Sequence, residues 1–175
     1  GTMEWSLVPG YVIAQMLGGF TGAALVWLFY KDHYDATEDP DTKLGTFCTM
    51  PAIEGHKVRN FFCEALGTWL LVFVILVFGF DANIPTIYAD GTHLHIGMGE
   101  LGAIPVTCLI MAIGMSLGGA TGYAINPARD LAPRIAHALL PIKGKRDSGW
   151  CYSWVPVAGP LVGAAVAALT YILLF

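Results

Sequence analysis

The sequence predicts an all-α membrane protein, and three features of the chain carry this prediction. Of its 175 residues, 55% are apolar and only 13% are charged, whereas a soluble domain carries about 25% charged residues. Several apolar segments are long enough to cross a hydrocarbon core of about 30 Å, which takes about 20 helical residues. A shorter apolar stretch follows a glycine-rich run. We therefore expect spanning helices together with one short helix that enters the membrane without crossing it.

Four segments qualify as membrane spans. Each is a mostly apolar run, and the second and third contain a single acidic residue each, Glu64 and Glu100. A segment of this length with so few charges is typical of a transmembrane helix. The predicted spans are residues 7–30, 60–80, 98–118 and 153–174.

Small residues recur four positions apart inside three of these spans. The pairs are Gly18 and Gly22, Gly114 and Gly118, and Gly159 and Gly163. This spacing lets two helix backbones approach closely in lipid. It therefore predicts a tightly packed bundle.

The connection 119–152 is too long for a simple loop and contains a second, shorter apolar pattern. Residues Leu131–Leu140 would form about 15 Å of helix, which is half a membrane span. The run Gly118–Gly122 that precedes them favours an unwound backbone. We expect residues 119–140 to form a re-entrant loop followed by a half-helix.

The half-helix has a clear predicted start. Asn126 is a favourable N-cap residue, and Pro127 follows at the first helical position, where its missing N–H costs nothing. Non-helical backbone at membrane depth is tolerated where it lines a wet cavity. The carbonyl groups of Gly122, Tyr123 and Ala124 would then act as a ladder of acceptors. The positive end of the half-helix dipole would disfavour cations and protons there, but not neutral solutes.

The string Asn126-Pro127-Ala128-Arg129-Asp130 resembles the motif of the aquaporin superfamily, in the branch of the glycerol uptake facilitators, or aquaglyceroporins. The similarity extends from Val8 to the end of the chain. It implies an aquaporin-like helical bundle that acts as a passive channel for glycerol and similar small neutral solutes, with some water. It also implies an integral, multi-pass protein of the cell membrane that is neither an enzyme nor dependent on a cofactor.

The resemblance also assigns roles to individual residues. It places Arg129, Tyr123 and Gly114 at the selectivity filter and gives Glu64 the task of bracing the loop before the half-helix. Tyr123 stands where facilitators commonly have phenylalanine, so its hydroxyl departs from the pattern. Five further positions match residues typical of the branch, namely Tyr30, Asp130, Arg134, Pro156 and Val157.

The resemblance further implies that the four predicted spans are the third to sixth of a six-span fold. Such a fold has a first repeat with its own Asn-Pro-Ala, and this sequence contains one such triplet. We therefore expect the chain to be the C-terminal part of a longer protein and to need that first half as a partner for a complete pore. The resemblance also implies a homotetramer that contacts membrane lipid and no nucleic acid.

The charges complicate the expected orientation. All nine Lys and Arg residues lie in segments 31–59 and 119–152, and segment 81–97 has none. The positive-inside rule would place the two long segments in the cytoplasm, whereas the family places them outside, with both ends of this piece inside. Our expectation follows the family.

The sequence leaves two alternative hypotheses about function open. A secondary transporter with broken helices would need a coupling-ion site, for which the spans offer Glu64 and Glu100. A membrane enzyme would need His33, His93 and His95, which lie in polar loops at no metal-ligand spacing. The four cysteines also lack such spacing, and the net charge of −4 comes with no basic patch for phosphate binding. The sequence therefore predicts no metal site.

Overall fold

The computed structural model of the chain describes residues 3–79, 86–87, 93–94 and 99–175. Its long helices are α1 (Val8–Phe29), α4 (Lys57–Phe78), α5 (Ala103–Leu117), α6 (Pro127–Leu139) and α7 (Val155–Leu174). Two short helices, α2 (Lys31–Ala36) and α3 (Pro40–Gly45), lie between α1 and α4. Two 3₁₀ turns, Trp5–Leu7 and Gly99–Gly102, precede α1 and α5. The two-residue strands β1 (Thr86–Ile87) and β2 (His93–Leu94) pair in antiparallel fashion.

Among the residues that the structure describes, three helices are long and apolar enough to cross a membrane: Trp5–Phe29, Lys57–Phe78 and Val155–Leu174. They correspond to the first, second and fourth predicted spans, and their bounds differ by a few residues. The third span, expected at 98–118, contains only the 15 residues of α5 as α-helix. Residues 80 and 98 of the expected spans lie outside the described residues. Glycine at both ends of the 3₁₀ turn Gly99–Gly102 disfavours an earlier start of α5.

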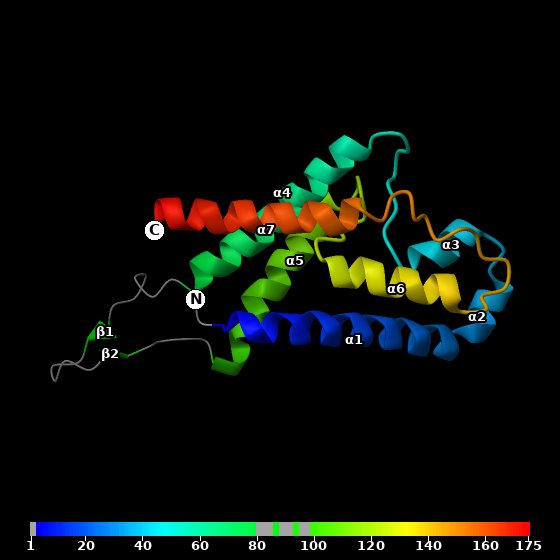
Figure 1. The fold of residues 1–175 in the computed structure, drawn as a ribbon, viewed down its shortest axis with the longest axis horizontal. Coiled ribbons are helices and arrows are strands. Elements are labelled where there is room, and N and C mark those ends of the chain that lie inside the picture. Colours follow the sequence, from blue (N-terminus) through cyan, green and yellow to red (C-terminus); the bar gives the residue numbers. More distant parts are fainter. Residues whose placement is uncertain (1–2, 80–85, 88–92, 95–98) are drawn as a thin grey trace.

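The helices pack in two groups (Figure 1). In the first, α7 crosses α4, and α5 leans against α4. In the second, α1 runs along α6, where Gly19 allows close approach: a Cβ at Gly19 would lie 3.0 Å from the Cβ of Ala132. Helix α6 also contacts α7 and so joins the two groups.

The three glycine pairs have three different surroundings. A Cβ at Gly163 would lie 2.2 Å from the carbonyl oxygen of Ala65, and one at Gly159 would lie 2.7 Å from the Cβ of Glu64. These two glycines therefore allow the close crossing of α7 over α4, which is the packing that the spacing predicts. The pair in α5 instead lies against the ring of Tyr123, and the pair in α1 has no neighbour within 4 Å among the described residues.

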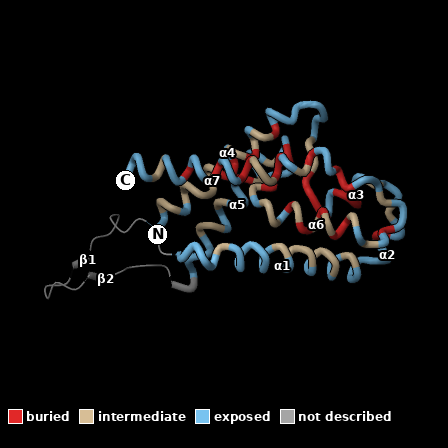
Figure 2. Tube along the Cα trace, viewed as in Figure 1, coloured by how far each residue is buried: buried red, intermediate tan, exposed pale blue. Residues whose placement is uncertain are grey.

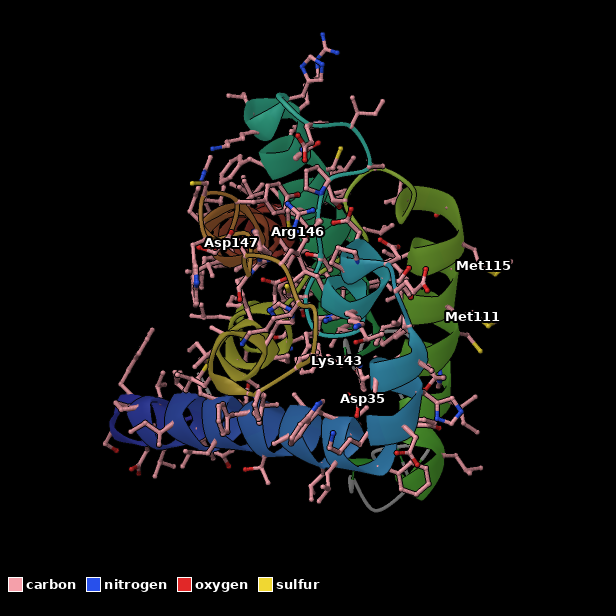
Figure 3. The ribbon with its side chains drawn as sticks, turned by 90° about the vertical axis from the view of Figure 1, so that its right-hand side faces the viewer. Asp35, Met111, Met115, Lys143, Arg146 and Asp147 are labelled. Atoms are coloured by element: carbon pink, nitrogen blue, oxygen red, sulfur yellow. The ribbon has the colours of Figure 1, made fainter. Side chains whose placement is uncertain are left out.

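The connections divide between the two ends of the bundle. The start of α1 and the end of α7 lie at one end, while α2, α3 and the segment after α6 lie at the other (Figure 1). Figure 3 views this second end and shows Asp35, Lys143, Arg146 and Asp147 on it. The side chain of Arg146 pairs with Asp41, which links the segment after α6 to α3.

The burial pattern is the reverse of that in a water-soluble domain. The buried residues gather around α6 and the loop before α4 (Figure 2), and they include Glu64, Asp130 and Arg134, each 1% exposed or less. In contrast, α1 contains no buried residue. Met111 and Met115 point outward from α5 (Figure 3) and are 62% and 83% exposed. Polar residues inside and apolar residues outside are what a bilayer selects, because lipid solvates apolar side chains but no polar backbone.

Candidate functional site

The start of α6 is built as the motif predicts. Asn126 has the extended backbone of an N-cap residue, with φ −156° and ψ 117°. Its Oδ1 accepts hydrogen bonds from the backbone N–H groups of Ala128 at 2.9 Å and Arg129 at 3.2 Å. Pro127 occupies the first turn. The cap satisfies helix donors that have no intrahelical partner, and it leaves the amide NH₂ of Asn126 free to donate elsewhere.

The residues just before the cap form a non-helical run with an uncommon backbone. Gly122, Tyr123 and Ile125 have positive φ values of 76°, 39° and 42°. For Tyr123 and Ile125 this left-handed conformation costs on the order of 1–3 kcal/mol each. Such a conformation persists only when the surrounding structure holds it in place.

Glu64 supplies the restraint from the middle of α4. Its Oε1 accepts the N–H of Ala124 at 3.0 Å, and its Oε2 accepts the N–H of Ile125 at 2.7 Å. The carboxylate is 1% exposed, and hydrogen bonds to a charged acceptor are stronger than neutral ones. Both oxygens of Glu64 are therefore occupied by the backbone of the non-helical run.

The carbonyl groups of the same run have no internal partner. Within the part of the chain that the structure describes, the oxygens of Gly122, Tyr123 and Ala124 accept no hydrogen bond. Ala124 is buried, whereas Gly122 and Tyr123 are exposed. A buried carbonyl without a partner costs free energy, and the two exposed carbonyls are open to water or a solute. The run is thus held by its N–H groups and leaves its C=O groups available.

Tyr123 lies against α5. A Cβ at Gly114 would lie 2.9 Å from the Cζ of Tyr123, and one at Gly118 would lie 2.6 Å from its Cδ1. Both distances are below what real Cβ atoms show, so any larger residue at Gly114 or Gly118 would displace the ring. The structure therefore brings Gly114 and Tyr123, two of the three residues assigned to the filter, into direct contact.

Arg129, the third of these residues, follows the cap in the first turn of α6. Its Nη1 donates to the carbonyl oxygen of Phe47 at 3.3 Å, and the residue is exposed in the described chain. Phe47 belongs to the loop before α4. The position of the guanidinium group therefore depends on that loop as well as on α6.

Asp130 and Arg134 form a fully buried ion pair behind Arg129. The Nη2 of Arg134 lies 2.7 Å from the Oδ1 of Asp130, and neither side chain is exposed. The Oδ2 of Asp130 accepts from both the N–H and the hydroxyl of Thr49, each at 2.7 Å. Arg134 also donates to the carbonyls of Thr49, Ser148 and Gly149, at 2.8, 2.7 and 3.1 Å.

Sequence reasoning missed the partner of Arg129 and the partners of this ion pair. Phe47, Thr49 and Ser148 lie in polar connections without a periodic pattern, and a loop residue that donates or accepts through its backbone leaves no trace in residue type. It also missed Lys145, whose Nζ donates to the carbonyls of His137, Ala138 and Leu140 at 2.7 Å each. Partial burial lowers the pKa of Lys145, but its charge matches the negative end of α6.

Three further predicted residues lie at the ends of helices α1 and α7. Tyr30 ends α1, where its ring meets Phe29 and His33 edge to face. Pro156 is buried in the first turn of α7, next to the half-buried Val157. No group of three or more metal-binding side chains occurs among the described residues. The side chains of His93, His95 and Glu100 lie outside the described residues.

Comparisons with known proteins agree with this architecture. The family model "Major intrinsic protein" matches residues 1–171. A probable glycerol uptake facilitator protein of Thermotoga maritima is 49% identical over 175 residues, which are 100% of this chain and 68% of that protein. The glycerol uptake facilitator protein of Bacillus subtilis is 46% identical over 171 residues, 98% of this chain and 57% of that protein.

A solved structure agrees as well. The aquaglyceroporin from Plasmodium falciparum superposes with a TM-score of 0.76 at 30% identity, over 97% of this chain and 64% of that one. These matches define an integral, multi-pass membrane protein of a channel family. The chain belongs to the major intrinsic protein family, which confirms the resemblance drawn from residues 126–130. It spans between 57% and 68% of the lengths of the two named relatives.

We predict that Glu64→Gln destabilises the protein more than it changes any pH dependence. An amide has one acceptor oxygen where the carboxylate has two, so one of the N–H groups of Ala124 and Ile125 loses its partner. The expected loss is about 1–3 kcal/mol of unfolding free energy. Thermal unfolding in detergent measures it, and an unchanged melting temperature together with flux that loses its pH dependence would contradict the bracing role.

Proposed function

We propose that the protein is a passive channel for glycerol and similar small neutral solutes, with some water, that excludes ions and protons. One observation carries the proposal. The backbone before α6 turns its N–H groups toward Glu64 and leaves the carbonyls of Gly122, Tyr123 and Ala124 without a partner among the described residues. A row of acceptors at the entry to a membrane half-helix suits a solute that carries several hydroxyl groups.

Donors for the same solute come from two neighbouring side chains. The Oδ1 of Asn126 is engaged by the helix cap, so its NH₂ group is the part that can donate to a passing hydroxyl. Arg129 adds guanidinium N–H groups one turn further along. A polyol can thus exchange its water shell for fixed donors and acceptors, which is how pores lower the cost of desolvation.

The apolar side of the passage would be formed by the ring of Tyr123. Its position depends on Gly114 of α5 and on Gly118, which caps that helix, since a side chain there would displace the ring. The carbon edge of glycerol fits an aromatic wall, while the hydroxyl of Tyr123 adds one polar group to it. We assign the filter to Arg129, Tyr123 and Gly114 on this basis.

Exclusion of cations follows from charge at the same place. The N-terminus of α6 carries about half a positive charge, and Arg129 adds a full one. Cations and hydrated protons are repelled from such a constriction, whereas neutral solutes are not.

The alternative of an ion-coupled transporter lacks support in the described residues. A coupling site would need free carboxylate oxygens, and both oxygens of Glu64 accept backbone N–H groups. The described residues therefore favour a channel.

The proposal is tested by flux into proteoliposomes that contain the intact protein. We expect glycerol influx that rises linearly with the gradient and does not respond to pH or sodium. Saturable uptake driven by a proton or sodium gradient would establish the transporter instead.

Arg129→Ala should weaken discrimination, because it removes the main fixed donor and one positive charge from the constriction. We expect lower selectivity for glycerol together with measurable proton leak, read from the permeabilities to glycerol, water and protons. The exposed residue Arg59 offers a matched control as Arg59→Ala. If the permeabilities to glycerol, water and protons all equalled those of the wild type, the assignment of Arg129 to the filter would be wrong.

We further propose that the protein works as a homotetramer in the cell membrane, with a first repeat completing each pore. The exposed apolar faces of α1 and α5 support a need for partners in the bilayer. Native mass spectrometry in mild detergent should give the mass of four protomers. A monomer that conducts glycerol at the wild-type rate would contradict the assembly.

A further inference from the structure

We propose that Arg134 and Asp130 are positioning residues that set the size limit of the filter, although neither side chain is accessible to a solute. This inference rests on the proposed function, because it concerns how Arg129 is held in the constriction. It follows from two sets of hydrogen bonds that the backbone of residues 47–49 joins. One set links the buried ion pair to Thr49, and the other links the carbonyl of Phe47 to the guanidinium group of Arg129.

The path begins at Arg129. Among the described residues its guanidinium group makes one hydrogen bond, from Nη1 to the carbonyl oxygen of Phe47 at 3.3 Å. A long, flexible side chain with a single partner takes its position from that partner. The location of the Phe47 carbonyl therefore decides how far Arg129 reaches across the passage.

The N–H of Phe47 donates to the carbonyl of Leu44 at 2.9 Å, and the backbone of one intervening residue joins its carbonyl to Thr49, two residues further along the same loop. The N–H and hydroxyl of Thr49 both donate to Asp130, and its carbonyl accepts from Arg134. All the polar groups of Thr49 are thus bound to α6, the helix that also carries Arg129. Movement of Thr49 would carry the Phe47 carbonyl with it.

The ion pair fixes this loop against a second one. The Nε and Nη2 atoms of Arg134 bind Asp130, while its Nη1 binds the carbonyls of Ser148 and Gly149. Gly149, with φ +67°, has no room for a side chain, because its Cβ would lie 3.0 Å from Nη1 of Arg134 and 2.7 Å from Sδ of Met50. The guanidinium fork therefore clamps the loops before α4 and after α6 at one point.

A lysine at position 134 would keep the positive charge, but it could not bind the carbonyls of both loops at once. Its ammonium group is a point donor on a flexible stem, whereas the planar fork addresses several acceptors at once. The variant Arg134→Lys should therefore preserve the pairing with Asp130 and release part of the two loops. A purely structural role predicts lower stability alone, and a positioning role predicts a changed filter as well.

The test uses the intact protein with Arg134→Lys, and with Arg146→Lys as the control, since Arg146 belongs to the exposed pair with Asp41. The first measurement is the ratio of erythritol to glycerol permeability in proteoliposomes. We expect this ratio to rise about fivefold in Arg134→Lys, because a displaced donor discriminates less well by solute size. The control should keep the wild-type ratio.

The second measurement does not depend on flux. Phenylglyoxal modifies accessible arginines, and mass spectrometry gives the rate at Arg129 with Arg59 as the internal reference. We expect faster modification of Arg129 in Arg134→Lys, since the hydrogen bond to Phe47 is loosened. If the wild type carries no glycerol, the proposed function fails, and this rate still decides whether Arg134 positions Arg129.

A folded Arg134→Lys protein with the wild-type permeability ratio and the wild-type rate at Arg129 would overturn the inference. Should this variant fail to fold, Thr49→Val decides with the same two measurements. Valine keeps the backbone N–H of residue 49 and removes only the hydroxyl that donates to Asp130. We expect a smaller change in the same direction, and wild-type values in both measurements would again overturn the inference.

Discussion

The structure depends on one interaction, the acceptance of two backbone N–H groups by the carboxylate of Glu64. A non-helical run at membrane depth must find partners for its polar backbone, and this run also contains left-handed residues at Tyr123 and Ile125. Glu64 binds the N–H groups of Ala124 and Ile125 and holds that conformation. The carbonyl groups of Tyr123 and Ala124 share trans peptide units with these two N–H groups and therefore point away from Glu64, which leaves them as acceptors for the proposed passage.

The same principle organises the outer part of the bundle. Two loops without regular structure meet α6. Asp130 and Arg134 of α6 bind backbone groups of these loops, and Lys145 of the second loop binds carbonyls at the end of α6. A buried ion pair is weak evidence for stability by itself. Here every charged group also binds backbone of another segment. The polar interior therefore fixes the geometry of the loops, while large apolar side chains lie on the exterior of the described residues.

Much of this architecture could be predicted from local chemistry. The spans follow from apolar length, and the start of α6 follows from Asn126 and Pro127 because a cap and a first-turn proline act over a few residues. The contact between Gly114 and Tyr123 could not be predicted from the sequence. Glycine spacing indicates that another segment approaches closely, but it does not show which segment. The Phe47 carbonyl and Thr49 were missed because backbone groups of an irregular loop carry no sequence signal. Helix α5 is shorter than the predicted span because a 3₁₀ turn with glycine at both ends precedes it. Hydropathy measures how apolar a segment is and does not show where its helix begins.

In the proposed passage, solute hydroxyls bind the carbonyls of Gly122, Tyr123 and Ala124, which have no partner among the described residues while Glu64 binds N–H groups of the same run. The most direct measurement is a high-resolution structure of the intact protein soaked in glycerol. We expect glycerol density within hydrogen-bond distance of these carbonyls and of the Arg129 guanidinium group, with its carbon edge on Tyr123. Carbonyls paired with protein groups, or glycerol bound only elsewhere, would contradict it.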